Sequence, residues 1–266
     1  FSVKFILLNT FLFFSLYFVN SKRFVLSNNF IPVFILLFVL AGLSAQPKFI
    51  EIFIISGLLT GSLFFLVSAS EKTPAPYPYF NAALFFSTAA LLEIKLIFFL
   101  ILLPAAIIIF RQGAFREFWA AIAGMLLPWW LFYGSFFALT GSCGILSESF
   151  TGLSKIQYPD FSIFRYETAF LLYLPLLVIY SSFFVFSKFN SLNTDHRLHF
   201  ILFFFAFLIS TVLNILYADM WYVLYPFSAF LISIPLSFYF NNSRRKLIPE
   251  IVFDLLVLLI IFTHVS

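Results

Sequence analysis

The sequence predicts an all-α membrane protein, a transmembrane bundle of about ten hydrophobic segments in one integral domain over residues 1–266. Of these residues 63% are hydrophobic and only 10% are charged, whereas about a quarter of a soluble domain is charged. Apolar runs such as FILLNTFLFFSLYFV are continuous, while the strands of a membrane barrel would alternate polar and apolar residues. The lipid bilayer is therefore the expected partner. The net charge of +4 reports membrane topology and not nucleic-acid binding.

The first half of the chain contains six of the expected segments. They cover 5–19, 30–45, 50–69, 80–92, 94–110 and 118–139. Several are shorter than the roughly 20 residues that cross a bilayer core, which is tolerated where a helix is buried among neighbours or lines a cavity. The two segments at 80–92 and 94–110 have two interpretations. They cross the membrane twice if the chain turns back at Glu93, and together they cross it once if the chain does not.

The second half follows a longer loop at 140–167 and contains the remaining four segments. They cover 168–186, 198–217, 222–240 and 249–262. The sequence shows no internal repeat and no appended soluble domain. It opens on Phe1 with neither a Met nor a signal-peptide cleavage site, so we expect the chain to begin inside a longer protein.

Basic residues predict the orientation of the bundle. If all ten segments cross, ten basic residues fall on one side and five on the other, and the richer side is expected to be cytoplasmic. Loop 140–167 is then expected to be external. The richer side holds Lys22, Arg23, Lys72, Arg111, Arg116, Lys188, Arg197, Arg244, Arg245 and Lys246, and the other holds Lys4, Lys48, Lys95, Lys155 and Arg165.

The stretch LLEIKLIFF at 91–99 places Glu93 and Lys95 inside an otherwise apolar region. An unpaired charge in hydrocarbon costs about 2.5–3.5 kcal/mol on insertion scales, so pairing or access to water is expected. One interpretation is a structural ion pair at a turn between helices. The other is a site in which Lys95 binds a phosphate and Glu93 acts as a base or a metal ligand. In both cases we expect the pair to face Asp219 or loop 140–167.

Further candidates lie on the same expected external side. Asp219, in YADMWY, is a second candidate for a catalytic carboxylate, or else a turn residue within an aromatic belt. Asp160 and Arg165, in YPDFSIFRYE, are candidates for substrate binding, or else simply solvate the loop together with Glu167.

Metal and cofactor sites are not expected. In DHRLH, His196 and His199 share one helix face with Asp195 nearby, but a zinc site normally needs three or four convergent ligands. Cys143 is the sole cysteine and has no histidine partner in sequence, so we expect neither an internal disulfide nor a thiol nucleophile. The basic stretches RRK at 244–246 and FRQGAFREFW at 110–119 are interpreted as anchors to anionic headgroups.

The stretch from Phe80 to Tyr133 resembles an uncharacterised multi-pass inner-membrane family of Bacteroidetes-type bacteria. The matching elements are FNA at 80–82, FR at 110–111, FREF at 115–118, and then Gly124 and Pro128. The SNNFIPVF segment upstream is also similar. The chain departs from the family pattern because no proline follows Arg111 and because Phe118 replaces a tryptophan. The resemblance implies a location in the bacterial inner (cytoplasmic) membrane and no particular chemistry.

A second stretch resembles the GT-C glycosyltransferases, which use polyprenyl-phosphate sugars on the external face. The similarity consists of ALLEIK at 90–95, the segment from Arg116 to Trp129, and WYVLYP at 221–226, which lacks the family's arginine. The acidic residue that this family places in its first external loop has no visible counterpart. Three functions remain open: a non-catalytic subunit or scaffold in envelope biogenesis with other membrane proteins as partners, a GT-C-like transferase, and a transporter or flippase.

Overall fold

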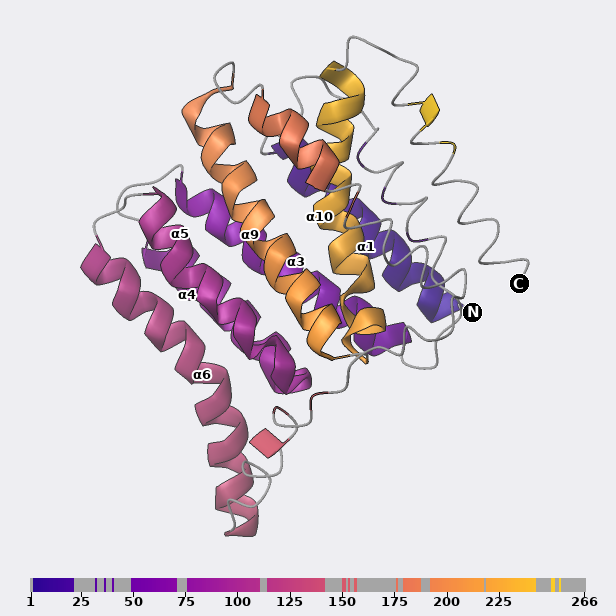
Figure 1. Ribbon diagram of the computed structural model, residues 1–266. Coiled ribbons are helices and arrows are strands. Elements are labelled where there is room, and N and C mark those ends of the chain that lie inside the picture. The colour runs from indigo at the N-terminus through magenta and orange to yellow at the C-terminus, as the bar shows by residue number, and fades with distance from the viewer. Residues whose placement is uncertain are drawn as a thin grey trace. The chain divides into compact units, whose positions relative to one another are not determined.

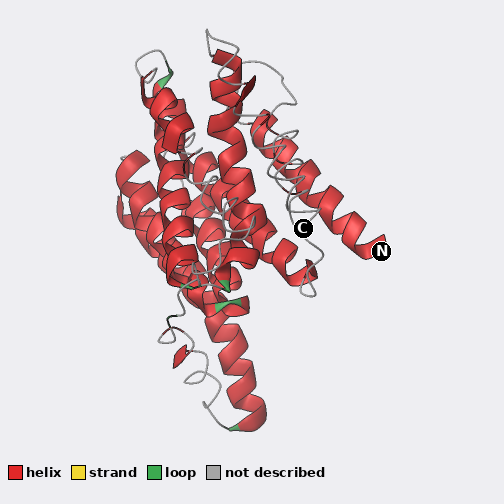
Figure 2. Cartoon of the chain, turned by 45° about the vertical axis from the view of Figure 1, so that its right-hand side comes forward, coloured by secondary structure: helices red, strands yellow, loops and turns green. Residues whose placement is uncertain are grey.

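The computed structural model describes a set of helices, with no strand among its described residues (Figures 1 and 2). The described residues are 2–21, 49–70, 76–110, 114–141, 179–187, 192–217 and 219–242, with isolated positions within 32–40, 150–156 and 250–254 and at 176. Their named helices are α1 (Ser2–Ser21), α3 (Phe49–Ser70), α4 (Pro76–Leu92), the 3₁₀ helix η1 (Ile94–Ile101), α5 (Leu102–Phe110), α6 (Ala114–Thr140), α9 (Thr194–Leu216) and α10 (Met220–Asn242).

Four of these helices are long and apolar enough to cross a membrane, which identifies the chain as a helical membrane protein. They are α3, α6, α9 and α10, and two shorter apolar helices run over Ile6–Asn20 and Ile94–Phe110. Seven of the ten expected segments coincide with described helices. The expected segments 30–45, 168–186 and 249–262 fall largely outside the described residues.

The chain divides into two compact units, and the first joins residues 1–53, 159–200 and 221–266. Its centre is α10, whose apolar residues are almost all buried. Aromatic pairs hold this unit together: Phe18 of α1 stacks on Phe230 of α10 at 5.4 Å between ring centroids. Phe200 of α9 meets Phe238 of α10 edge-on at 5.6 Å.

The second unit, residues 54–158 and 201–220, contains a helical hairpin that turns at Glu93. Phe86 of α4 and Phe99 of η1 are 13 residues apart, yet their rings stack at 6.2 Å. One continuous helix would separate them by about 20 Å. Glu93 has an extended backbone, with φ −139° and ψ 107°. Residues 80–110 therefore form two antiparallel arms and not one long helix (Figure 1).

The second arm of this hairpin is lengthened by its 3₁₀ turn geometry. A 3₁₀ helix rises about 2.0 Å per residue and an α-helix about 1.5 Å. The eight residues of η1 and the nine of α5 thus span about 30 Å, close to the thickness of a hydrocarbon core. With three residues per turn, Leu96, Phe99 and Leu102 share one face, and all three are fully buried.

The first arm, α4, packs closely on α6. A Cβ atom at Gly124 would lie only 2.3 Å from the carbonyl oxygen of Phe80, so a glycine is needed for this approach. Beside it, the Ser87 hydroxyl donates a hydrogen bond of 2.6 Å to the carbonyl of Met125. A proline, Pro128, lies within α6 one turn further on, and it lacks the N–H that an interior helical residue would donate.

Candidate functional site

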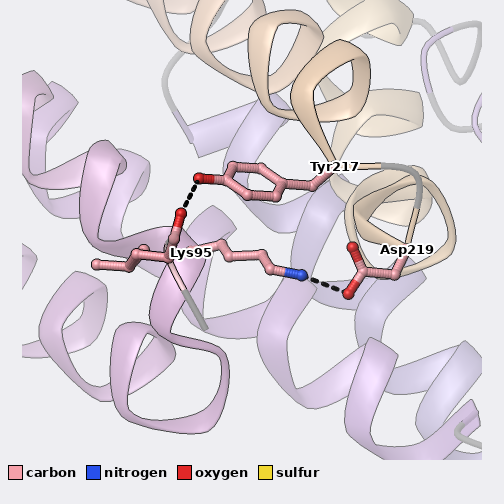
Figure 3. A network of polar contacts seen from close by, with 4 residues as sticks. Lys95, Tyr217 and Asp219 are labelled. Atoms are coloured by element: carbon pink, nitrogen blue, oxygen red, sulfur yellow. Dashed lines mark hydrogen bonds and ion pairs between the residues drawn. The ribbon is translucent and has the colours of Figure 1, made fainter. Parts of the chain in front are cut away.

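The candidate site is a polar cluster in the second unit, built around Lys95. Lys95 lies in the first turn of η1, directly after the hairpin turn. Its ammonium group forms an ion pair with the carboxylate of Asp219, 124 residues later in the chain (Figure 3). The expectation that Lys95 faces Asp219 is therefore confirmed, and its ion pair is not the local one with Glu93.

Asp219 is positioned by the short turn between α9 and α10. The N–H of Met220 donates to the carbonyl of Tyr217 at 3.0 Å, and the N–H of Tyr217 continues the helical pattern by donating to Leu213 at 2.9 Å. This turn places Asp219 directly before the first residue of α10, a position in which aspartate is favoured by the helix dipole. The sequence YADM thus forms a compact connection that presents one carboxylate.

Tyr217 joins the ion pair to a third segment of the chain. The Nζ atom of Lys95 lies 4.9 Å from the centroid of the Tyr217 ring, within the range of a cation–π interaction. The Tyr217 hydroxyl donates a 2.9 Å hydrogen bond to the carbonyl of Leu153, which belongs to the expected external loop. Figure 3 shows the ring lying beside the lysine side chain while its hydroxyl points away to that carbonyl.

Burial in this cluster is uneven between the two charges. The Lys95 side chain is 11% exposed, whereas that of Asp219 is 52% exposed. The carboxylate therefore remains accessible, and the ammonium group is enclosed between its counter-charge and an aromatic ring. Such an arrangement can stabilise a junction of helices, and its accessible carboxylate could also accept a proton or a hydrogen bond from a ligand.

Glu93 occupies the hairpin turn itself and is half-buried. Its N–H donates to the carbonyl of Ala89 at 3.0 Å, and its own carbonyl accepts from the N–H of Leu96 at 3.0 Å. The other sequence-predicted candidates Asp160 and Arg165, together with Glu167 and Cys143, lie outside the described residues.

The two histidines of DHRLH lie in α9 with ring centroids 6.3 Å apart, and His199 is buried. Across the described ranges, no group of three or more His, Cys, Asp or Glu residues is arranged to hold a metal ion. Arg197, between them in sequence, uses its Nε to donate to the carbonyl of Leu192 at 2.8 Å.

Sequence reasoning did not foresee a second polar feature, at the contact of α4 with α6. Glu117 and Tyr79 are both fully buried there and are close enough to interact electrostatically. The sequence predicts only a headgroup anchor for the stretch around Glu117. The only sequence signal for a different role is that Glu117 is the single acid in that basic stretch.

Comparisons with protein-family models, curated proteins and solved structures return no match.

Proposed function

We propose that this chain is a multi-pass protein of the bacterial inner membrane, with about ten transmembrane segments. In this proposal it is a non-catalytic subunit or scaffold in the biogenesis of the cell envelope. Support comes from the four membrane-length apolar helices, from the antiparallel arms of residues 80–110, and from the excess of basic residues on one expected side.

The observation that best supports the non-catalytic role is that Lys95 is paired with groups of the chain itself. Its charge is neutralised within the chain by Asp219, and its flank is covered by the ring of Tyr217. A lysine engaged in this way is not available to a phosphate unless Asp219 is displaced. Lys95 of η1, Asp219 of the α9–α10 turn and, through Tyr217, Leu153 come together in this cluster, so the cluster serves to join three parts of the second unit.

A charge-removal cycle tests this proposal. Asp219→Asn leaves the enclosed Lys95 ammonium without a counter-charge, and we expect a loss of about 3 kcal/mol of stability. Lys95→Met leaves a half-exposed carboxylate, which solvent screens, so we expect only about 1 kcal/mol. The double variant Lys95→Met with Asp219→Asn buries no unpaired charge and should regain near-native stability. Thermal unfolding of the purified protein in detergent measures all three.

The same variants separate the scaffold from an enzyme. Complementation of a strain lacking the protein reports its function, and a scaffold predicts that the stable double variant complements. A double variant that is stable and inserted but fails to complement would contradict the non-catalytic role.

One observation favours a GT-C-like transferase as the second candidate: the Asp219 carboxylate is half-exposed beside a lysine. In that function Lys95 would exchange Asp219 for the phosphate of a polyprenyl-phosphate-linked sugar, and Asp219 or Glu93 would act as the base. Lys95 would then be required whichever carboxylate is the base, so loss of complementation with retained stability in the double variant is the result that this function predicts.

A further inference from the structure

The second unit contains an open apolar groove between α5 and the first turn of α6. It has a volume of about 420 Å³ and is lined by Pro104, Ile107, Ile108, Phe115 and Phe118. Ile108 and Phe115 are each 75% exposed, so the groove opens to the surroundings of the protein. Because every lining side chain is apolar, its occupant must present hydrocarbon along this length.

The first turn of α6, which contributes one side of the groove, also carries a positive charge. Arg116 lies between Phe115 and Phe118 in the sequence and is exposed. The next residue, Glu117, is fully buried within the protein. The accessible part of this helical turn therefore carries one cation and no accessible acid, and the positive end of the helix dipole adds to it.

Trp119 lies beside the two phenylalanines that line this end of the groove. Its ring lies 6.1 Å from the rings of both Phe115 and Phe118 and is 55% exposed. Exposed tryptophans of membrane proteins gather at the level of the headgroups. An exposed tryptophan, an exposed arginine three residues before it and an apolar groove together match the chemistry of one anionic lipid.

We propose that the groove between α5 and α6 binds an anionic phospholipid, with an acyl chain along Pro104, Ile107 and Ile108 and the headgroup at Arg116. Charge complementarity selects this occupant over a zwitterionic lipid, because one basic residue near a membrane surface favours an anionic lipid about fivefold. The lipid would fill a cavity that the chain leaves open and would fix α5 against α6.

Tryptophan quenching by brominated phospholipids tests the site in the full chain. The reporter variant keeps Trp119 and carries Trp129→Phe, Trp130→Phe and Trp221→Phe. Reconstituted vesicles contain a small equal fraction of either brominated phosphatidylglycerol or brominated phosphatidylcholine. We expect the anionic lipid to occupy the Trp119 position about fivefold more strongly. Arg116→Gln should remove this preference, and Ile108→Phe, which fills the groove, should reduce quenching by both lipids.

The matched control is a variant that keeps only Trp130. This residue lies 11 positions further along α6, about 17 Å away, and is 72% exposed, but it does not line the groove. It should be quenched equally by the two lipids. Equal quenching at Trp119, a preference that survives Arg116→Gln, or the same preference at Trp130 would each overturn the proposal. Displacement by millimolar inorganic phosphate would also overturn it, because the site would then bind a free anion and not a lipid.

Discussion

Gly124→Ala is expected to destabilise the protein by forcing α4 and α6 apart. The added Cβ would lie 2.3 Å from the carbonyl oxygen of Phe80 and 3.0 Å from the Cβ of Ala83. Carbon–oxygen contacts in close helix pairs are normally about 3.3–3.6 Å, so the helices must separate by about 1 Å. The obstructing atom belongs to the backbone, and a change of rotamer cannot relieve the contact.

The size of the stability loss depends on the interactions that are disrupted when α4 and α6 separate. The hydrogen bond from Ser87 to the carbonyl of Met125, now 2.6 Å, would stretch to about 3.6 Å and be lost, at about 1 kcal/mol. Overpacking adds about 1–3 kcal/mol, and the better helix propensity of alanine returns up to about 1 kcal/mol. The expected net loss is about 2 kcal/mol, or roughly 5 °C in thermal midpoint for a chain of this size.

Gly134→Ala on the same helix is the matched control. A Cβ atom there meets nothing within 4 Å, so the alanine should be neutral or stabilise by up to about 1 kcal/mol. Gly61→Ala should fall between the two, because its Cβ meets the Phe85 ring at 3.0 Å, which can move. Thermal unfolding in detergent, followed by circular dichroism, ranks the three variants. If Gly124→Ala proves as stable as Gly134→Ala, the close approach of α4 and α6 is refuted.

Two further predictions concern the Lys95 cluster and the topology. Tyr217→Phe should cost about 1 kcal/mol by removing the bond to Leu153 while keeping the ring over Lys95, and Tyr217→Leu should cost about 1 kcal/mol more because it also removes the cation–π contact. An equal loss in both variants would show that the ring contributes nothing. In a Cys143→Ser background, Lys155→Cys and Arg245→Cys should react with an impermeant thiol reagent from opposite sides of the membrane. Labelling of both from one side would contradict the ten-segment topology.

The sequence by itself determined the class of this protein and the approximate position of the helices that the structure describes. So few charges cannot cover a soluble surface, and the apolar runs lie close to the observed helices: residues 50–69 were expected where α3 covers Phe49–Ser70. The charged pair in LLEIKLIFF also indicated the need for a partner, since a charge in an apolar region must be neutralised or hydrated, but the sequence left open whether residues 80–110 turn back at Glu93.

The tertiary structure decided which residues meet. In a soluble helix a polar stripe distinguishes the outer face from the core, but lipid and protein interior are both apolar, and α1, α3, α4 and α10 carry no such stripe to indicate their contacts. The sequence therefore left Lys95 with two alternative partners, and only the fold selected Asp219. The sequence also could not predict the 3₁₀ geometry of η1 or the burial of Glu117, because both depend on how α4 packs against η1 and α6.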